Sequence, residues 1–152
     1  IILAEAKVFS SLQKLNLENC GIMSPGILAL AKSANLKQLR EVTLNKNTIK
    51  DKGIQYLAAS KNFSNLKILK VGGISISDQA VKALVLSEHL KNLVELGLNG
   101  NGITREGLKF LHDTPNLATL QKIDLRRNKF VYEDCVFLSD SPRFKNLEVV
   151  RF

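Results

Sequence analysis

The chain has 152 residues, of which 45% are hydrophobic, so it is long enough to bury the core of one domain. Its 22 basic and 14 acidic side chains give a net charge of +8, which leaves nucleic acid and anionic membrane surfaces open as partners until the charges are placed. With 3 prolines and 9 glycines it is neither collagen-like nor of low complexity, and no apolar run approaches the roughly 18 residues of a membrane-spanning helix.

Apolar residues recur at a fixed interval along the whole chain. One position is leucine six times, each 27 residues after the last: Leu12, Leu39, Leu66, Leu93, Leu120 and Leu147. Five further apolar positions of the unit keep the same interval. Six positions that never lose register predict repeated copies of one structural unit.

Each unit is expected to contain a strand, a turn and a helix. Leu15-Asn16-Leu17 alternates apolar and polar residues, which is typical of a short half-buried strand. The equivalent strand cores are 15–17, 42–44, 69–71, 96–98, 123–125 and 150–152. Helical spacing of apolar residues follows each turn, and the helix-start signals are Ser24 before Pro25, Asp51, Ser77-Asp78 and Thr104. Neither element buries its apolar face alone, so neighbouring units must stack.

The fourth complete unit carries a resemblance to a known family. This unit resembles the leucine-rich repeat in its ribonuclease-inhibitor-like subclass. The resemblance lies in the run Leu93-x-x-Leu96-x-Leu98-x-x-Asn101-x-Ile103-x-x-x-Gly107-x-x-x-Leu111. A second similarity, to the cysteine-containing repeats of F-box ubiquitin-ligase subunits, rests on Cys20 and Ile103-Thr104-x-x-Gly107-Leu108. The resemblance covers essentially the whole chain and implies an α/β fold: a curved solenoid with a parallel sheet on the concave face and helices on the convex face.

Residues 1–152 are expected to form a single segment of five to six repeats. Leu3 and Phe9 fit the register of helix and return-loop positions of later units, and the chain stops on a strand at Phe152. Neither end carries the polar, atypical unit that caps a solenoid. We therefore expect the chain to be a fragment of a longer protein that lacks both caps.

The turn after each strand has an asparagine position, which in the family bonds backbone groups of adjacent units. Asn47, Asn101 and Asn128 occupy it, whereas Cys20 and Ile74 replace it. Because Ile74 has no polar side-chain atom, the third unit must satisfy those backbone groups differently. Gly72 and Gly73 just before it indicate an adjusted turn, and the alternatives are sequence drift in a tolerant repeat or a bend or binding notch.

No residue pattern points to catalysis, a metal or a cofactor. His89 and His112 hold different positions of the repeat, with no second ligand spaced for a metal and no triad partners. Gly97-x-x-Gly100-x-Gly102 crosses a strand and a turn rather than opening a helix. The chain is therefore not expected to be an enzyme. Asn62-Phe63-Ser64 fits a glycosylation acceptor, a short and weakly specific pattern.

The two cysteines indicate the kind of cellular compartment in which the protein is found. Cys20 and Cys135 lie four units apart, roughly 20 Å at about 4.8 Å per strand, which is too far for a disulfide. Both are expected to be buried thiols, which suits a reducing compartment, and we expect a cytoplasmic location.

Three rows of side chains are predicted to form the concave face. The first row is Lys14, Glu41, Ile68, Glu95, Lys122 and Val149; the second is Asn16, Thr43, Lys70, Gly97, Asp124 and Arg151; the third is Glu18, Asn45, Gly72, Asn99 and Arg126. They hold five basic and four acidic residues and no aromatic one, whereas a nucleic-acid groove needs a basic stripe with aromatic platforms. Neighbouring strands are expected to pair Lys14 with Glu41, Glu95 with Lys122, and Asp124 with Arg151. Neither nucleic acid nor a membrane is therefore expected as a partner.

The resemblance implies a protein-interaction module that docks a partner on the concave sheet and adjacent turns. The candidate partner-binding residues gather at the C-terminal end and suit an acidic protein: Lys122, Asp124, Arg126, Arg127, Lys129 and Arg151. Arg126 is expected to be available because Asn99 is its neighbour in the row, and the alternative is a merely solvated cluster. Other functions implied by related repeats are substrate recognition in a ubiquitin ligase, a host-targeted bacterial effector, and inhibition or activation of an enzyme.

Overall fold

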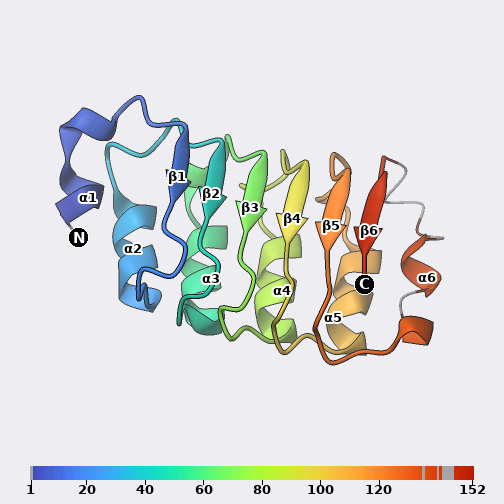
Figure 1. Cartoon of the computed structure of the whole chain (residues 1–152). Helices are drawn as coiled ribbons and strands as arrows, with labels where there is room; N and C mark the ends of the chain where they lie inside the picture. The colour runs from blue at the N-terminus through green and yellow to red at the C-terminus, as the bar shows by residue number, and fades with distance from the viewer. Residues whose placement is uncertain (1, 135, 140, 142–145) are drawn as a thin grey trace.

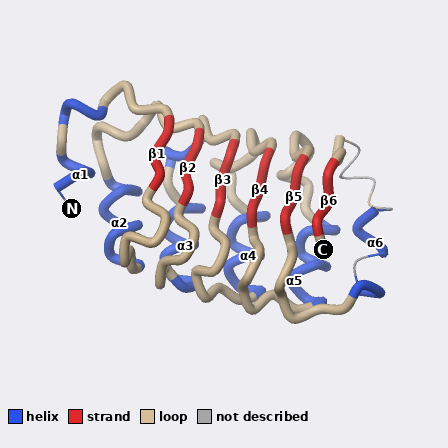
Figure 2. Tube along the Cα trace, viewed as in Figure 1, coloured by secondary structure: helices blue, strands red, loops and turns tan. Residues whose placement is uncertain are grey.

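The computed structural model describes residues 2–134, 136–139, 141 and 146–152. Within these ranges six parallel strands form one sheet in chain order: β1 (Lys14–Asn16), β2 (Glu41–Thr43), β3 (Ile68–Lys70), β4 (Glu95–Gly97), β5 (Lys122–Asp124) and β6 (Val149–Arg151). The α-helices are α1 (Ile2–Glu5), α2 (Ser24–Lys32), α3 (Lys50–Ala58), α4 (Asp78–Val85), α5 (Arg105–Asp113) and α6 (Val136–Ser139). Single 3-10 turns are η1 (Lys7–Phe9), η2 (Lys61–Phe63) and η3 (Tyr132–Asp134). The strands line one face and the helices cover the other (Figures 1 and 2), which confirms the predicted solenoid.

The register of the sheet follows the sequence repeat without a slip. Every strand residue pairs with the residue 27 positions later, as Leu69 does with Leu96 and Leu96 with Ile123. The strands begin one residue before the predicted cores, but the ladder still extends past them, since the Leu17 N–H donates to the Thr43 carbonyl at 2.8 Å. The first and second predicted rows are therefore confirmed as neighbouring positions across the sheet.

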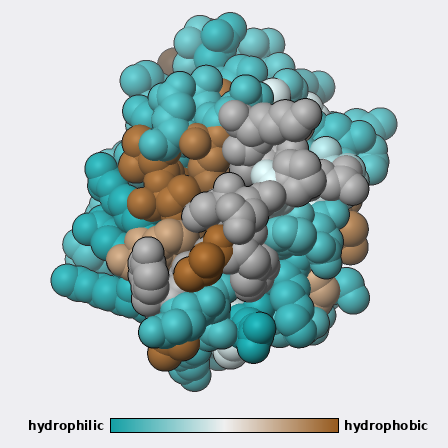
Figure 3. Space-filling model, turned by 90° about the vertical axis from the view of Figure 1, so that its right-hand side faces the viewer, coloured by the Kyte–Doolittle hydropathy of each residue, from teal (hydrophilic) through white to brown (hydrophobic). Residues whose placement is uncertain are grey.

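The repeating apolar positions fill the space between the sheet and the helices. Leu69 and Leu96 are both 0% exposed, as are the leucines of the first repeat position in the three units around them, Leu39, Leu66 and Leu93. Burial falls off toward the ends, where Leu12 and Val150 are only partly buried. Apolar surface gathers on the face at the C-terminal end of the solenoid (Figure 3). Exposed apolar residues of the last described segments are Val131, Val136 and Phe152. The central units thus hold the best-enclosed part of the core.

Two of the four predicted helix starts are confirmed as side-chain caps. Ser77 accepts from the Gln79 N–H and Thr104 from the Glu106 N–H. Asp51 does not cap its own helix: its two carboxylate oxygens accept from the N–H and hydroxyl of Ser77 in the next unit, at 2.7 and 2.6 Å. The equivalent Asp78 accepts in the same way from Thr104. These carboxylates therefore tie consecutive helix N-termini together.

The Ser24 signal has another role as well. The cap of α2 is Met23, without a side-chain hydrogen bond, and the Ser24 hydroxyl donates to the Ile49 carbonyl at 2.7 Å. A second set of hydroxyls joins the far ends of the helices, each donating to a carbonyl 29 residues earlier. Its donors recur every 27 residues: Ser33, Ser60, Ser87, Thr114 and Ser141. Hydrogen bonds between units therefore run along both edges of the helical layer.

The asparagine position works as predicted where asparagine is present. The Asn101 amide donates to the carbonyls of Val71 and Leu98, both at 2.9 Å, and its oxygen accepts from Ile74 N–H at 3.0 Å. Asn47 and Asn128 repeat the pattern; Asn128 lies one unit after Asn101, and Asn47 lies two units before it, with Ile74 in the unit between. Ile74 itself is 0% exposed and packs in the core.

The backbone adjusts where asparagine is missing. The residue after Cys20 and the residue after Ile74 have left-handed φ, +64° at Gly21 and +63° at Ser75. The residues after the three asparagines are not left-handed. Gly73 is left-handed too, but this is common to its position in every unit, namely Asn19, Lys46, Gly100 and Arg127. The adjusted turn is thus confirmed, and Ser75 rather than the Gly72-Gly73 pair marks it.

The prediction of a buried Cys20 is wrong. Cys20 lies exposed in a turn, and its thiol donates to the Glu18 carbonyl at 3.3 Å. The asparagines bond backbone groups of the preceding unit, as Asn47 does with Leu17 and Ile22, whereas Cys20 follows the edge strand β1, which has no preceding strand in the sheet. Cys135, Arg143, Phe144 and Lys145 lie outside the described residues, and the side chain of Leu3 is not described.

The glycosylation pattern is not accessible. Asn62 is 9% exposed, and its amide donates to the carbonyls of Leu30, Ala31 and Ser33. A glycan on that nitrogen would remove all three contacts between units. In the described part of the chain, no helix combines the length and apolarity needed to cross a membrane.

Candidate partner-binding site on the concave face

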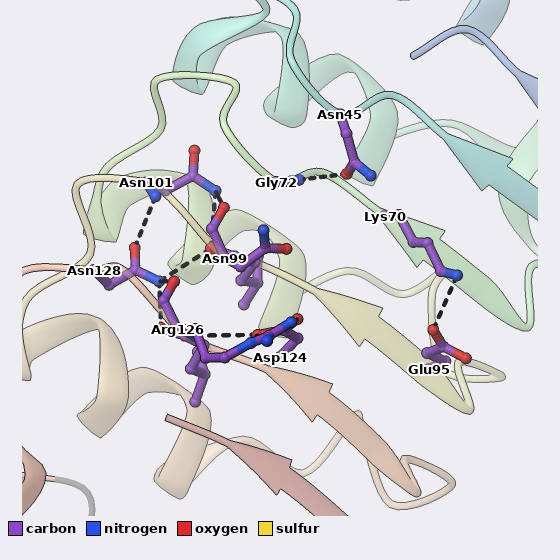
Figure 4. A network of polar contacts seen from close by, with 11 residues as sticks. Asn45, Lys70, Gly72, Glu95, Asn99, Asn101, Asp124, Arg126 and Asn128 are labelled. Atoms are coloured by element: carbon purple, nitrogen blue, oxygen red, sulfur yellow. Dashed lines mark hydrogen bonds and ion pairs between the residues drawn. The ribbon is translucent and has the colours of Figure 1, made fainter.

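A hollow of about 380 Å³ opens on the concave face over the C-terminal half of the sheet. Strands β3 to β6 and the turns that follow β2, β4 and β5 supply its lining: Asn45, Lys70, Glu95, Leu96, Gly97, Asn99, Lys122, Ile123, Asp124, Arg126, Val149 and Arg151. Figure 4 shows several of its polar side chains pointing from neighbouring strands into one region.

Two glycines remove side chains from this part of the face. Gly97 lies in the second row between Lys70 and Asp124. Gly97 is buried, and the three atoms nearest to a Cβ added there would all belong to Lys70, at 3.5 to 3.7 Å, which is ordinary van der Waals contact. At Gly72 an added Cβ would come 2.6 Å from the Asn99 side-chain oxygen, because the Asn99 amide lies over that glycine. Gly97 therefore lines the hollow, whereas the space over Gly72 is taken by the Asn99 side chain.

Two ion pairs form the walls beside Gly97. On one side, Lys70 Nζ lies 3.2 Å from Glu95 Oε1. On the other, the Arg126 guanidinium donates from Nε and Nη2 to the two oxygens of Asp124, at 2.9 and 2.6 Å. These hydrogen bonds lower the pKa of the Asp124 carboxyl, and they raise the pKa of Arg126. Both pairs are drawn in Figure 4.

The remaining cations of the hollow carry no such partner. Among the described residues, neither Lys122 nor Arg151 forms a salt bridge, although the charge of Arg151 also lowers the pKa of Asp124. Both side chains are exposed. The Asn99 side-chain amide likewise makes no hydrogen bond within the described ranges. The β5–β6 side of the hollow therefore presents two positive charges without a salt bridge among the described residues, and the Asn99 amide lies on the opposite side, over Gly72.

The N-terminal half of the concave face is balanced by contrast. Lys14 lies 3.0 Å from Glu41, and Lys46 lies 2.8 Å from Glu18. With Lys70 and Glu95, every lysine of strands β1 to β4 and the turn after β2 has a carboxylate partner on a neighbouring strand or turn. Exposed pairs of this kind contribute little stability, about 0–1 kcal/mol each, but they cancel local charge. Unpaired positive charge on the sheet is thus concentrated at β5 and β6.

The structure brings together four of the six predicted site residues. Lys122, Asp124, Arg126 and Arg151 all line the hollow. Arg127 and Lys129 lie exposed on the turn after β5 and do not line it. Sequence analysis missed Lys70, Glu95, Gly97 and Asn99; the signal that was available was a pair of glycines in adjacent concave rows.

Of the three predicted ion pairs, Lys14 with Glu41 is confirmed. The other two pairs face each other across the sheet as expected but form no salt bridge: Glu95 pairs with Lys70 on the preceding strand, and Asp124 pairs with Arg126. The prediction that Arg126 is available is wrong for the same reason. A residue two positions away on its own chain reaches the carboxylate as easily as one on the next strand.

Neither histidine lies in the hollow. His89 is partly buried, and His112 Nδ1 lies 2.8 Å from Asp113 Oδ1 on the helical side. Among the described residues, no group of three or more His, Cys, Asp or Glu side chains is arranged to hold a metal ion.

The parallel sheet, the helical outer layer and the asparagine-linked turns define a leucine-rich-repeat solenoid. A family model described as Leucine Rich repeat matches residues 10–31, 36–58 and 89–111. Among solved structures, the chain is similar to an internalin (inlF) from Listeria monocytogenes str. 4b F2365, with 25% identity and a TM-score of 0.58. The similarity covers 82% of this chain but only 31% of that one, so the chain spans about a third of the length of the internalin. A comparison with curated proteins finds no match.

Proposed function

We propose that this chain is a non-catalytic protein-interaction module whose partner docks on the concave sheet and adjacent turns. Leucine-rich repeats and the internalin-like fold support an interaction module in general. The observation that carries the docking site is the contrast along the sheet: lysines of β1 to β4 are paired with carboxylates, whereas Lys122 and Arg151 are unpaired beside a hollow. A surface of this sign favours an acidic protein partner, because opposite potentials steer association and set register.

The roles within the predicted cluster differ from one another. Lys122 and Arg151 form no salt bridge with any of the described residues, so they are the primary contacts in this proposal. Arg126 is already held by Asp124 at 2.6 Å and acts mainly as a wall of the hollow. Arg127 and Lys129 lie on the rim, where they add long-range attraction for an acidic surface.

We place the module in the ribonuclease-inhibitor-like subclass and in a longer, cytoplasmic protein. The subclass is supported by the 27-residue register and by helices α2 to α5 on the convex side. In a longer protein, such a module serves to select the substrate of a ubiquitin ligase, to target a host protein, or to inhibit or activate an enzyme. The same concave surface would serve each of these.

Charge reversal tests the docking site. The variant Lys122→Glu with Arg151→Glu should weaken partner binding by more than tenfold, because it removes two attractions and adds two repulsions. The control is Lys32→Glu with Lys37→Glu; both lysines are exposed, and neither lies in a concave row. Lys82 is unsuitable as a control because its ammonium lies 5.5 Å from the Phe110 ring. Partners captured from cell extract by the unmodified chain would be identified and titrated against both variants, and equal loss in both would overturn the site.

A further inference from the structure

The hollow has a definite shape as well as a charge. Its floor is Gly97, with Lys70 and Asp124 as strand neighbours in the same row. Both of those side chains are held in ion pairs, to Glu95 and Arg126, and the Lys70 side chain lies within 3.6 Å of the Cβ position of the buried Gly97. Gly97 therefore lines the hollow without a side chain of its own, bordered by side chains that are already fixed.

The chemistry of the lining favours one negative group. Four basic and two acidic side chains line the hollow, which leaves an excess of two positive charges. Both carboxylates are already engaged, so a cationic ligand would have to compete with Lys70 or Arg126 for them. The unengaged groups are the Lys122 ammonium, the Arg151 guanidinium and the Asn99 amide, all of which can donate hydrogen bonds to a carboxylate.

The size of the hollow limits what enters it. At about 380 Å³ it lies at the lower end of the range for ligand pockets, roughly 300–1,000 Å³. That volume suits one side chain with its flanking backbone rather than a folded domain. The face around it is a shallow parallel sheet, on which an extended segment can lie.

Resting on the proposed function, we propose that this hollow is an anchor subsite for a single glutamate or aspartate side chain of an extended partner segment. The side chain enters above Gly97, and its carboxylate is neutralised by Lys122 and Arg151 and accepts a hydrogen bond from the Asn99 amide. Gly97 is then the residue that determines specificity, because any larger residue there occupies the space that the partner side chain needs.

Peptide selection tests the subsite with a random library in place of the partner. Random dodecamer peptides displayed on phage would be selected against the whole 152-residue chain, and the enriched peptides synthesised and titrated by fluorescence anisotropy. Enriched sequences should share an acidic residue. Replacing that residue by Gln or Asn should weaken binding by more than tenfold, a measurement that leaves the protein unchanged.

Filling the hollow is the second arm. Gly97→Leu should abolish binding of these peptides, and the fold should survive because a Cβ at Gly97 makes only ordinary contacts. The matched control is Asn16→Leu, which adds a similar side chain to the same row at the other end of the sheet, where it should leave affinity unchanged. A thermal melt of each variant by circular dichroism confirms that it is folded.

The outcomes separate this inference from the proposed function. One outcome is that the peptides lose affinity for the variant Lys122→Glu with Arg151→Glu, but bind Gly97→Leu normally and tolerate loss of their own acidic residue. That outcome overturns the anchor subsite and leaves docking on the concave face supported. Peptides that tolerate all of these changes overturn both. A selection that enriches no peptide, or none with a shared acidic residue, also overturns the subsite.

Discussion

Asp124 holds the guanidinium of Arg126 through both carboxylate oxygens, at 2.9 and 2.6 Å, and also accepts from the Arg126 backbone N–H at 3.2 Å. These two residues, at the end of β5, thus bond to each other on the concave face. Arg126, which was expected to be available to a partner, is therefore engaged within the protein. The positive charge that a partner meets comes from Lys122 and Arg151 instead.

The pKa of Asp124 reports whether Arg126 is paired with it. Arg126→Gln should raise that pKa toward the ordinary aspartate value, because the hydrogen bonds from Arg126 are the main cause of its depression. Carbon-13 NMR titration of the side-chain carboxyls would measure it. Lys46→Gln is the matched control: it should raise the pKa of Glu18, which Lys46 lowers, and leave Asp124 unchanged. An unmoved Asp124 titration in Arg126→Gln would contradict the pairing.

The sign of the pH dependence follows from the same shift. Because the folded pKa of Asp124 lies below its unfolded value, the pair stabilises the fold above the unfolded pKa and loses that effect as pH falls through the folded pKa. The stability difference between the unmodified chain and Arg126→Gln, measured by urea unfolding, should therefore be present at pH 7 and vanish in strong acid. A difference that grows on acidification would contradict this.

Core substitutions test the register of the repeat. Leu69→Ala and Leu96→Ala should each lower the free energy of unfolding by about 2–5 kcal/mol, because both side chains are 0% exposed and each leaves a cavity between enclosed units. Urea unfolding followed by circular dichroism measures the change. Lys67→Ala, at an exposed position just before β3, should cost less than about 0.5 kcal/mol. A loss of unfolding free energy below about 1 kcal/mol for both leucine variants would contradict the assigned register.

The hydrogen bonds between units made by the asparagine position should contribute more to the free energy of unfolding than those of exposed amides. Asn101→Leu keeps the size of the side chain but leaves the carbonyls of Val71 and Leu98 and the N–H of Ile74 without their partner. Each unpaired group costs about 1–3 kcal/mol, so the loss should exceed about 2 kcal/mol. Asn92→Ala is the control, since Asn92 is exposed and its amide makes a single bond, to the Ser64 carbonyl. Similar losses for the two variants would refute a special role for the asparagine position.

The fold was predictable because it depends on a period, and a period survives local variation. The spacing of Leu12, Leu39 and their equivalents determines which residues are neighbours across the sheet, and no long side chain needs to be placed to read it. The hydroxyl series that begins at Ser33 and Ser60 has the same 27-residue spacing and was equally readable, but it lies outside the apolar pattern.

The candidate site was predictable only in part, because ion pairing depends on rotamers rather than on register. Glu95 has lysines on both neighbouring strands, at Lys70 and Lys122, and the sequence does not distinguish them. The choice of Lys70 leaves Lys122 unpaired and so decides where positive charge remains. The exposure of Cys20 has another cause, because its turn follows the edge strand β1 and no preceding strand of the sheet covers it.

The last prediction uses the Asp124–Arg126 unit to raise affinity. Asp124→Asn removes a negative charge from the wall of the hollow and releases the Arg126 guanidinium from its carboxylate. If an acidic segment binds beside Lys122 and Arg151, it then meets one more available cation and one fewer repulsive charge, so its affinity should rise about three- to tenfold. Titration of a selected acidic peptide at low and high salt measures the change, which should shrink as salt screens it. Glu88→Gln, a charge removal of the same size on an exposed side chain that pairs with Lys91, should leave affinity unchanged. Weaker binding by Asp124→Asn would show instead that Asp124 contacts a basic group of the partner.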